Sequence, residues 1–282
     1  FALVALLSDG AIEALLTAGS DAQKARFLEP LVSGRWTGTM NLTEPHAGSD
    51  LGVMKSRAER RDDGTYRIFG QKIYITWGEH EITENIIHLV LARLPDAPAG
   101  TRGISLFLVP KYLVNDDGSI GARNDLHCHS LEHKLGIHGS PTCTMIYGDG
   151  KFGDEAGAIG WLIGEENKGL ACMFTMMNNA RLAVGMQGVA ICEAATQKAV
   201  QYAKDRTLGK APGWSGSGMS PIIEHPDVAR MLVTMKALTQ GSRAICYVCA
   251  HATDMSHHAD GDEARHWAER AALLTPIAKS FA

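Results

Sequence analysis

Apolar residues recur at helical spacing through residues 1–34. Gly19 and Ser20 interrupt the pattern, and Ser20 with Gln23 has the spacing of a capping box, in which each side chain bonds the backbone amide of the other residue. A second short helix follows, with three apolar residues expected on one face: Leu28, Leu31 and Val32. The pattern therefore predicts two helices before residue 35.

The pattern changes between residues 35 and 160. Glycine and proline separate short runs that alternate or are rich in β-branched residues: GTMNL, TYRIFG, KIYIT, IIHLVLA, GISLFLVP and CTMIY. Strands this short and regularly spaced favour a sandwich or barrel over βαβ units. No GxGxxG sequence opens a helix here, which argues against a Rossmann dinucleotide site.

Long helices are predicted again between residues 161 and 282. Asn167 is expected to cap the first of them, which runs to about Arg206 with a set of apolar residues: Leu170, Phe174, Met177, Leu182, Val189 and Ile191. Pro226 has the first-turn position of a second helix, whose apolar stripe is predicted to be buried: Val228, Met231, Leu232, Met235 and Leu238. A last helix is expected from about Asp262.

The predicted fold class is therefore α+β. Residues 1–34 would end an N-terminal helical domain, residues 35–160 would form a small β-barrel or sandwich middle domain, and residues 161–282 would form an incomplete bundle of long helices. Because helical patterns are already under way at both termini, we expect the chain to be an internal fragment of a longer protein.

Composition narrows the class of protein. Apolar residues make up 45% of the 282 residues, which is ordinary for a globular protein, and the net charge of −4 argues against a nucleic-acid partner. No apolar run is long enough to span a bilayer. Scattered cysteines in mostly apolar surroundings fit reduced thiols in a cytoplasmic protein: Cys128, Cys143, Cys172, Cys192, Cys246 and Cys249.

The loop NLTEPHAGSD contains little that is bulky. Pro45 fixes one backbone angle and Gly48 permits left-handed or close-approach geometry, while Thr43 and Ser49 can donate hydrogen bonds. Successive amides in such a turn can bind an anion or an oxygen. The alternative is a plain turn that Asp50 caps, and the loop alone favours that alternative.

A second stretch, GQKIYITWG, alternates so that Tyr74 and Thr76 would lie on one strand face, opposite Ile73 and Ile75. Together the two stretches resemble the acyl-CoA dehydrogenase family of flavoproteins, in which such a turn and strand form a wall that holds FAD. The segments HKLGIHGSPTC and GEENKGL…NNARLAVG match the family in the same order. The resemblance covers essentially the whole chain and implies the same order of helices, β domain and helical bundle.

The resemblance implies a set of flavin contacts: Met40, Leu42, Thr43, Gly48, Ser49, Tyr74, Thr76 and Arg206. Thr43 would bond near flavin N5, Ser49 would lie where flavin and acyl-CoA contacts meet, and Arg206 would reach the FAD of a neighbouring subunit. Met40 stands where many relatives carry Tyr, and Trp77 where they carry Asn.

Substrate contacts are implied for Ser49, Asn178 and Arg181. The last two match a D-x-x-R pair that touches the CoA portion, with Asn in place of Asp. The family's catalytic base is a Glu in a Gly-rich motif, which this chain lacks. We therefore expect that base beyond Ala282, no catalytic residue within the chain, and no activity from the chain alone.

The implied reaction is α,β-dehydrogenation of an acyl-CoA thioester, with the β-hydride passing to flavin N5. The implied partners are an acyl-CoA substrate, an electron-transfer flavoprotein as electron acceptor, and further copies in a homodimer or homotetramer. Within the family the chain resembles a long bacterial branch that includes 3-(methylthio)propionyl-CoA dehydrogenases. Two alternatives stay open: an acyl-CoA oxidase or other flavin enzyme of this fold, and a noncatalytic scaffold of this fold.

Two clusters raise the alternative of a metal site. His127, His129, His133 and His138 lie close together in the sequence, and Cys246 and Cys249 are three residues apart. A His-rich surface strand explains the first cluster, and two thiols packed on one helix face explain the second. No metal is expected.

Overall fold

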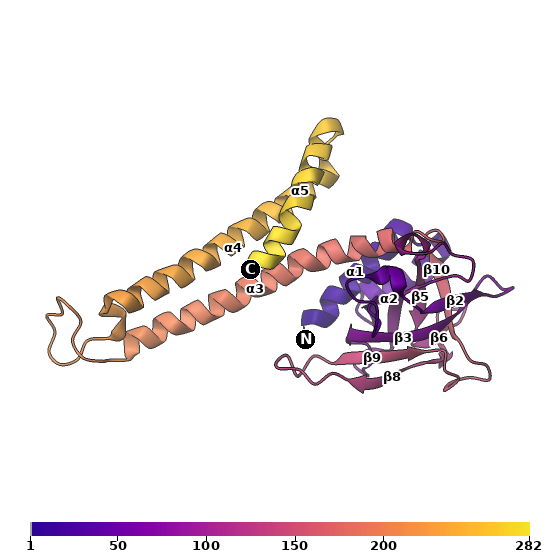
Figure 1. Cartoon of the computed structure of the whole chain (residues 1–282), viewed down its shortest axis with the longest axis horizontal. Helices are drawn as coiled ribbons and strands as arrows, with labels where there is room; N and C mark the ends of the chain where they lie inside the picture. The colour runs from indigo at the N-terminus through magenta and orange to yellow at the C-terminus, as the bar shows by residue number, and fades with distance from the viewer. Residues whose placement is uncertain (1) are drawn as a thin grey trace. The chain divides into compact units, whose positions relative to one another are not determined.

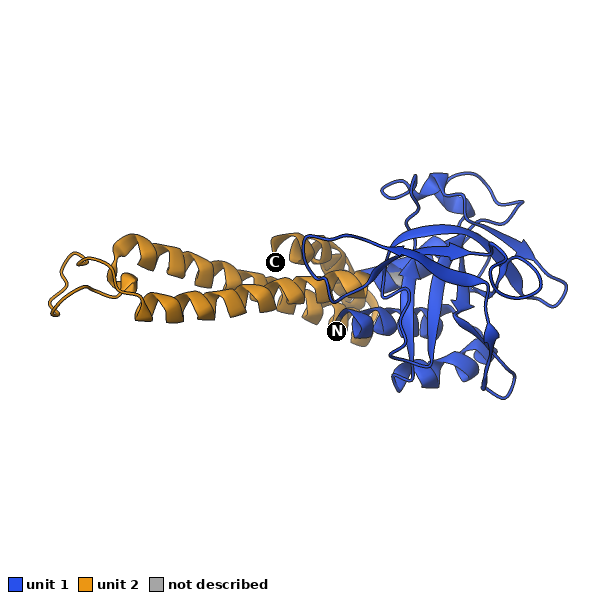
Figure 2. Ribbon diagram, turned by 90° about the horizontal axis from the view of Figure 1, so that it is seen from below, with its two compact units in different colours: residues 1–177 blue, residues 178–282 orange. Residues whose placement is uncertain are grey.

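The computed structural model describes residues 2–282, which form two compact units, residues 2–177 and 178–282 (Figure 2). Helix α3 (Gly169–Asp205) contributes to both units. The fold is α+β, with helices first, then strands, then long helices, as predicted. The boundaries proposed from the sequence at residues 34 and 160 remain an interpretation of the pattern.

Two helices open the first unit, α1 (Ala2–Ala18) and α2 (Asp21–Val32). Both bonds of the predicted capping box are present, since the Ser20 amide donates to Gln23 Oε1 at 2.9 Å and the Gln23 amide donates to Ser20 Oγ at 3.2 Å. Leu31 is buried, but Val32 is 68% exposed, so the predicted apolar face of α2 is one residue too wide.

One sheet of eight strands forms the middle of the first unit (Figure 1). Its strands are β1 (Trp36–Asn41), β2 (Arg57–Arg60), β3 (Tyr66–Thr76), β4 (Asn85–Ala92), β5 (Ser105–Pro110), β8 (Leu126–Leu131), β9 (Thr142–Tyr147) and β10 (Ala158–Ile163). The order is β1-β4-β5-β10-β3-β9-β8, and β2 pairs with β3. Only β1 and β4 run parallel among the described pairs. A separate hairpin joins β6 (Tyr112–Val114) to β7 (Ile120–Arg123), and single 3-10 turns are η1 (Leu51–Val53) and η2 (Thr101–Gly103).

Strand β4 lies between two cores, and every one of its residues is buried. Leu89 and Leu91 belong to the core under α1 and α2, while Val90 and Ala92 belong to a core on the other sheet face. A strand covered on both faces reads as a continuous apolar run, which is why IIHLVLA was recognisable. The predicted strand segments all lie in β1, β3, β4, β5 or β9, and the two segments TYRIFG and KIYIT form a single strand.

The second unit contains α3 from Asn178, the 3-10 turn η3 (Ile222–Glu224), α4 (Pro226–His258) and α5 (Gly261–Phe281). Pro226 occupies the first turn of α4 as predicted. The predicted buried stripe is wrong: Met231 and Leu238 are 45% and 54% exposed, and Val228, Leu232 and Met235 are only half-buried. Among the described residues, no helix has both the length and the apolar character that crossing a bilayer requires.

Asn167 does not cap α3. The helix begins at Gly169, and Asn167 lies outside it with a φ of +66°. Its amide donates to Ser105 Oγ at 2.8 Å, so the residue ties the entry of the helix to β5. Asn adopts left-handed backbone more readily than other non-glycine residues, which explains why it is suited to this turn.

Candidate functional site

The loop Leu42–Asp50 and the end of β3 lie side by side, as the sequence motifs predict. The Ile73 amide donates to the carbonyl of Thr43 at 2.9 Å. The ammonium group of Lys72 donates to the carbonyl of Leu42 at 3.0 Å. Met40 and Leu42 are half-buried and pack against the core beneath. Two segments that are thirty residues apart in the sequence therefore form one continuous surface.

A buried ion pair holds this surface from behind. Lys72 Nζ lies 2.9 Å from Glu44 Oε1, and their side chains are 0% and 2% exposed. The Glu44 carboxylate also accepts the amides of Lys55 at 2.7 Å and Ser56 at 3.0 Å. Burial lowers the pKa of Lys72 to about 8, although Glu44 opposes the shift. Burial raises the pKa of Glu44, but Lys72 and the amide donors outweigh it and keep that pKa below its usual value.

The loop itself is a tight turn. The Glu44 amide donates to the Ala47 carbonyl at 2.9 Å, and the Ala47 amide returns a bond at 3.1 Å. Asp50 caps η1 by accepting the Gly52 amide at 2.8 Å, as the plain-turn interpretation expected. Gly48 has neither a left-handed φ nor a close backbone approach, since an added Cβ would meet only Thr43 Cγ2 at 3.6 Å. Among the described residues, no neighbour therefore requires position 48 to lack a side chain.

Strand β3 contains a bulge at Tyr74. Lys72 pairs with Met145 but Ile75 pairs with Cys143, so β3 has one extra residue between these pairs. The predicted strict alternation is therefore interrupted, and Lys72 and Ile75 are both buried. Tyr74 has a φ of +61° and is 60% exposed. The bulge turns this aromatic side chain outward on the surface beside the loop.

Three hydroxyl groups of this surface have no hydrogen-bond partner among residues 2–282: Thr43, Ser49 and Thr76. The backbone amides of Gly48 and Ser49 also donate to no described acceptor. Groups of this kind, beside an exposed aromatic ring, can bind a flat heteroaromatic ligand that carries carbonyl and phosphate oxygens. The residues present therefore fit the flavin that the sequence motifs imply.

A chain of buried polar groups lies at the end of β1, next to this surface. Tyr147 donates to Asn41 Oδ1 at 2.8 Å, and Asn41 Nδ2 donates to Thr39 Oγ1 at 2.8 Å. Thr39 Oγ1 lies 2.8 Å from Nδ1 of His88, which is fully buried. Burial, together with the positive charge of Arg123, lowers the pKa of His88 to about 3. The imidazole is therefore neutral at physiological pH.

The other predicted contacts lie in the second unit. Arg181 Nη1 donates to Asn178 Oδ1 at 3.0 Å, so the structure brings this pair together. Arg206 follows the last residue of α3 and is exposed. The roles proposed for the three residues remain predictions.

The two clusters considered as metal sites are arranged differently. His127 Nε2 lies 2.9 Å from Asp149 Oδ2, while His129, His133 and His138 are not brought into any group of metal-binding side chains within residues 2–282. Cys246 and Cys249 are buried in the core of the second unit, which confirms the packing interpretation. All six cysteines are free thiols.

Two grooves are lined by residues outside the two sequence motifs. One of about 650 Å³ is bordered by α2 and the β6–β7 hairpin, and one of about 270 Å³ lies between α3 and α4. Neither is lined by a predicted site residue. On the surface formed by the loop and β3, Gly48, Ser49 and Tyr74 are exposed.

Glu44 and Lys72 were missed as a functional pair, although both lie inside the quoted motifs. A lysine inside a predicted strand, directly before the apolar Ile73, was the available signal, because a lysine that becomes buried requires an anionic partner. The sequence alone does not say which of several nearby carboxylates that partner is.

Comparison with known proteins agrees with this architecture. Residues 39–149 match the family model described as "Acyl-CoA dehydrogenase, middle domain", and residues 167–273 match "Acyl-CoA dehydrogenase, C-terminal domain". The chain belongs to the acyl-CoA dehydrogenase family.

Individual members of the family resemble the chain to different degrees. The chain is 53% identical over 282 residues to 3-methylmercaptopropionyl-CoA dehydrogenase of Ruegeria pomeroyi, a match that covers 100% of this chain and 46% of the relative. It is 40% identical to a butyryl-CoA dehydrogenase of Syntrophomonas wolfei, covering 98% and 45% of the two chains. The Caenorhabditis elegans protein ACDH-11 has the same fold, with a TM-score of 0.78 at 23% identity over 98% of this chain and 44% of that protein. The chain thus spans a little less than half the length of these relatives.

Proposed function

We propose that the protein carrying this chain catalyses FAD-dependent α,β-dehydrogenation of an acyl-CoA thioester. The observation that carries the proposal is the bond between the Ile73 amide and the Thr43 carbonyl. It joins the loop and β3 into one surface with free hydroxyls at Thr43, Ser49 and Thr76. When bound, the flavin supplies a hydride acceptor for the β-carbon of the substrate.

In this proposal the chain binds and orients. Thr43 and Thr76 donate hydrogen bonds to the ring edge, Ser49 and the Gly48 amide bind phosphate or substrate oxygens, and Tyr74 presents an aromatic face. Each of these donors is free of partners among the described residues, so binding breaks no bond seen there. Removal of the α-proton is assigned to no residue of this chain.

The proposed substrate carries a small acyl group, because the two relatives compared above are named for methylmercaptopropionyl-CoA and butyryl-CoA. Asn178 and Arg181 are proposed to contact its CoA portion. An electron-transfer flavoprotein is proposed as electron acceptor, and self-association into a dimer or tetramer is proposed for the protein. Initial rates with a panel of acyl-CoA thioesters, with and without oxygen as the acceptor, test these assignments.

Thr76→Val and Ser49→Ala are each expected to weaken flavin binding about three- to tenfold, since each removes one hydrogen bond of ordinary strength. The measurement is titration of flavin into the deflavinated protein, expressed from its complete gene, followed by flavin fluorescence. Ser119→Ala, on the separate β6–β7 hairpin, is the matched control and should bind flavin as the wild type does. Equal flavin affinity in all four proteins contradicts the assignment of Thr76 and Ser49.

A further inference from the structure

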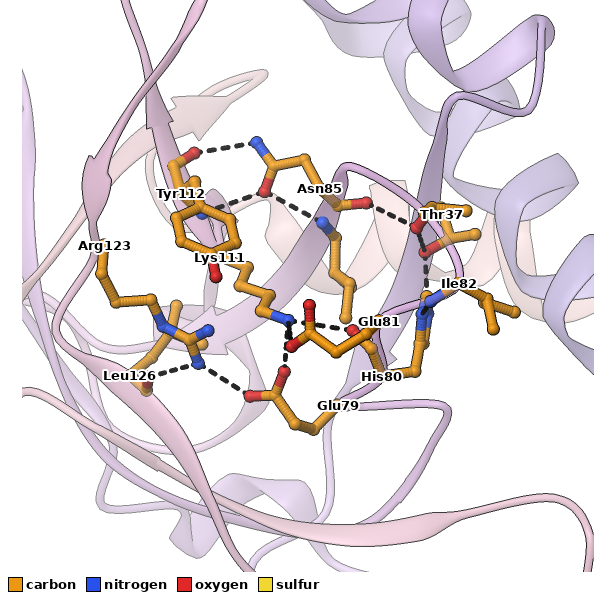
Figure 3. Close-up of polar contacts among 12 residues, drawn as sticks. Thr37, Glu79, His80, Glu81, Ile82, Asn85, Lys111, Tyr112, Arg123 and Leu126 are labelled. Carbon is orange, nitrogen blue, oxygen red and sulfur yellow. Dashed lines mark hydrogen bonds and ion pairs between the residues drawn. The ribbon is translucent and has the colours of Figure 1, made fainter.

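A second polar cluster lies directly after β3, outside the surface described above (Figure 3). We name it the Lys111 cluster; it consists of Glu79, His80, Glu81, Lys111 and Arg123. Lys111 is 1% exposed, and its ammonium group has three partners on one short segment: it donates to Glu81 Oε1 at 2.7 Å and to the His80 carbonyl at 2.9 Å, and it forms an ion pair with Glu79 Oε1 at 2.6 Å. One lysine therefore fixes three consecutive residues.

Arg123 completes the charge balance of the Lys111 cluster. Its guanidinium donates to Glu79 Oε2 at 2.7 Å and to the Leu126 carbonyl at 3.2 Å. Burial raises the pKa of Glu79, but bonds from Lys111 and Arg123 outweigh it and keep that pKa below its usual value. Two cations and two carboxylates offset each other, so the buried lysine does not lie in the core uncompensated.

His80 connects the Lys111 cluster to its neighbours. Its Nε2 lies 3.1 Å from Thr37 Oγ1 on β1, and its ring meets the ring of Trp77 edge-on, with centroids 5.5 Å apart. Burial and Lys111 lower the pKa of His80, which favours a neutral ring. Trp77 is thus held from one side by a residue that Lys111 itself fixes.

Trp77 follows Thr76 directly and has a φ of +55°, a conformation that a bulky residue adopts only where its surroundings enforce it. Its amide donates to the Pro141 carbonyl at 2.8 Å. Gly78 next to it lies so close to β9 that an added Cβ would meet Met145 Sδ at 2.9 Å and Cys143 Cβ at 3.0 Å. The turn that ends the flavin surface is therefore tightly constrained on both sides.

We propose that Glu79 and Lys111 are positioning residues, which set the Thr76–Trp77 turn so that Thr76 presents its hydroxyl to the flavin. This inference rests on the proposed function. A plain connection between β3 and β4 does not need a buried lysine with three polar partners, whereas such a lysine stabilises a turn that must keep one hydroxyl fixed. Neither Glu79 nor Lys111 touches Thr76, so both act through the segment from Trp77 to Glu81.

The test compares Glu79→Gln with Asp125→Asn in the protein expressed from its complete gene. Asp125 is a matched buried carboxylate of the same unit, which accepts three amides of another loop: Gly150, Phe152 and Gly157. Both variants lose a negative charge, which is buried at Asp125 and half-buried at Glu79. Only Glu79→Gln is expected to weaken flavin binding, about tenfold, and to speed deuterium uptake by the peptide covering residues 72–81 of the flavin-free protein.

Three results decide the matter. Weaker binding and faster exchange in Glu79→Gln, with Asp125→Asn like the wild type in both measurements, support the positioning role. Wild-type flavin affinity and exchange in Glu79→Gln, or equal losses in both variants, overturn it while leaving the proposed function intact. Failure of the wild-type protein itself to bind flavin overturns the proposed function and this inference with it.

Discussion

Replacing Lys72 with methionine is expected to lower the free energy of unfolding at pH 7 by about 3–5 kcal/mol, which is the usual cost of removing one partner of a buried ion pair. The variant leaves the Glu44 carboxylate, 2% exposed, without Lys72, while His46 Nε2 stays 3.4 Å from Glu44 Oε2. Two backbone amides still donate to that carboxylate, but they do not neutralise it. The measurement is urea denaturation followed by tryptophan fluorescence, to which the buried Trp36 of the first unit contributes.

The double variant Lys72→Met with Glu44→Gln distinguishes a charge effect from lost packing. It should be more stable than Lys72→Met alone, because no uncompensated charge stays buried. Glu59→Gln, which removes the partner of exposed Arg57, is the control and should change stability by less than about 0.5 kcal/mol. A Lys72→Met variant as stable as this control would show that the pair does not hold the loop against β3.

The sequence predicts the parts of this structure that depend on repeated local signals. The capping box at Ser20 and Gln23 needs only two residues at fixed spacing, and both of its bonds are present. The apolar run of β4 reflects burial on both faces. The motifs around Thr43 and Thr76 gave the family and, through it, the contact between loop and strand, because the family's arrangement already contains that contact.

Other features depend on partners distant in the sequence. The bulge at Tyr74 arises from the pairing of β3 with β9, and a single-strand pattern contains no sign of it. Asn is a common N-cap residue, but the amide of Asn167 donates a hydrogen bond to Ser105 on β5. Met231 and Leu238 have helical spacing, but spacing identifies an apolar face without identifying what covers it. Lys111 likewise meets Glu79, His80 and Glu81 only when β5 and β3 join one sheet through β10.

The second large effect is expected on lowering the pH. The pKa of His88 is about 3 in the folded protein and about 6.5 in the unfolded chain. At pH values between these two, the unfolded chain therefore binds a proton at His88 and the folded protein does not. The stability that neutral His88 contributes is therefore complete above pH 6.5 and is lost progressively as the pH falls toward 3. Between pH 7 and pH 5 this one group should lower the free energy of unfolding by about 2 kcal/mol.

His88→Asn removes this titration while keeping a polar atom near Thr39, so the variant should lose about 2 kcal/mol less than the wild type between pH 7 and pH 5. Urea denaturation at both pH values measures the difference. His129→Asn, at an exposed position of β8, is the control and should keep the wild-type pH dependence. An equal slope in His88→Asn and wild type would mean that the buried imidazole accepts a proton without unfolding. If the free energy of unfolding depends less on pH in the His88 variant alone, the hydrogen-bonded chain from His88 to Tyr147 is stable only while the imidazole is neutral.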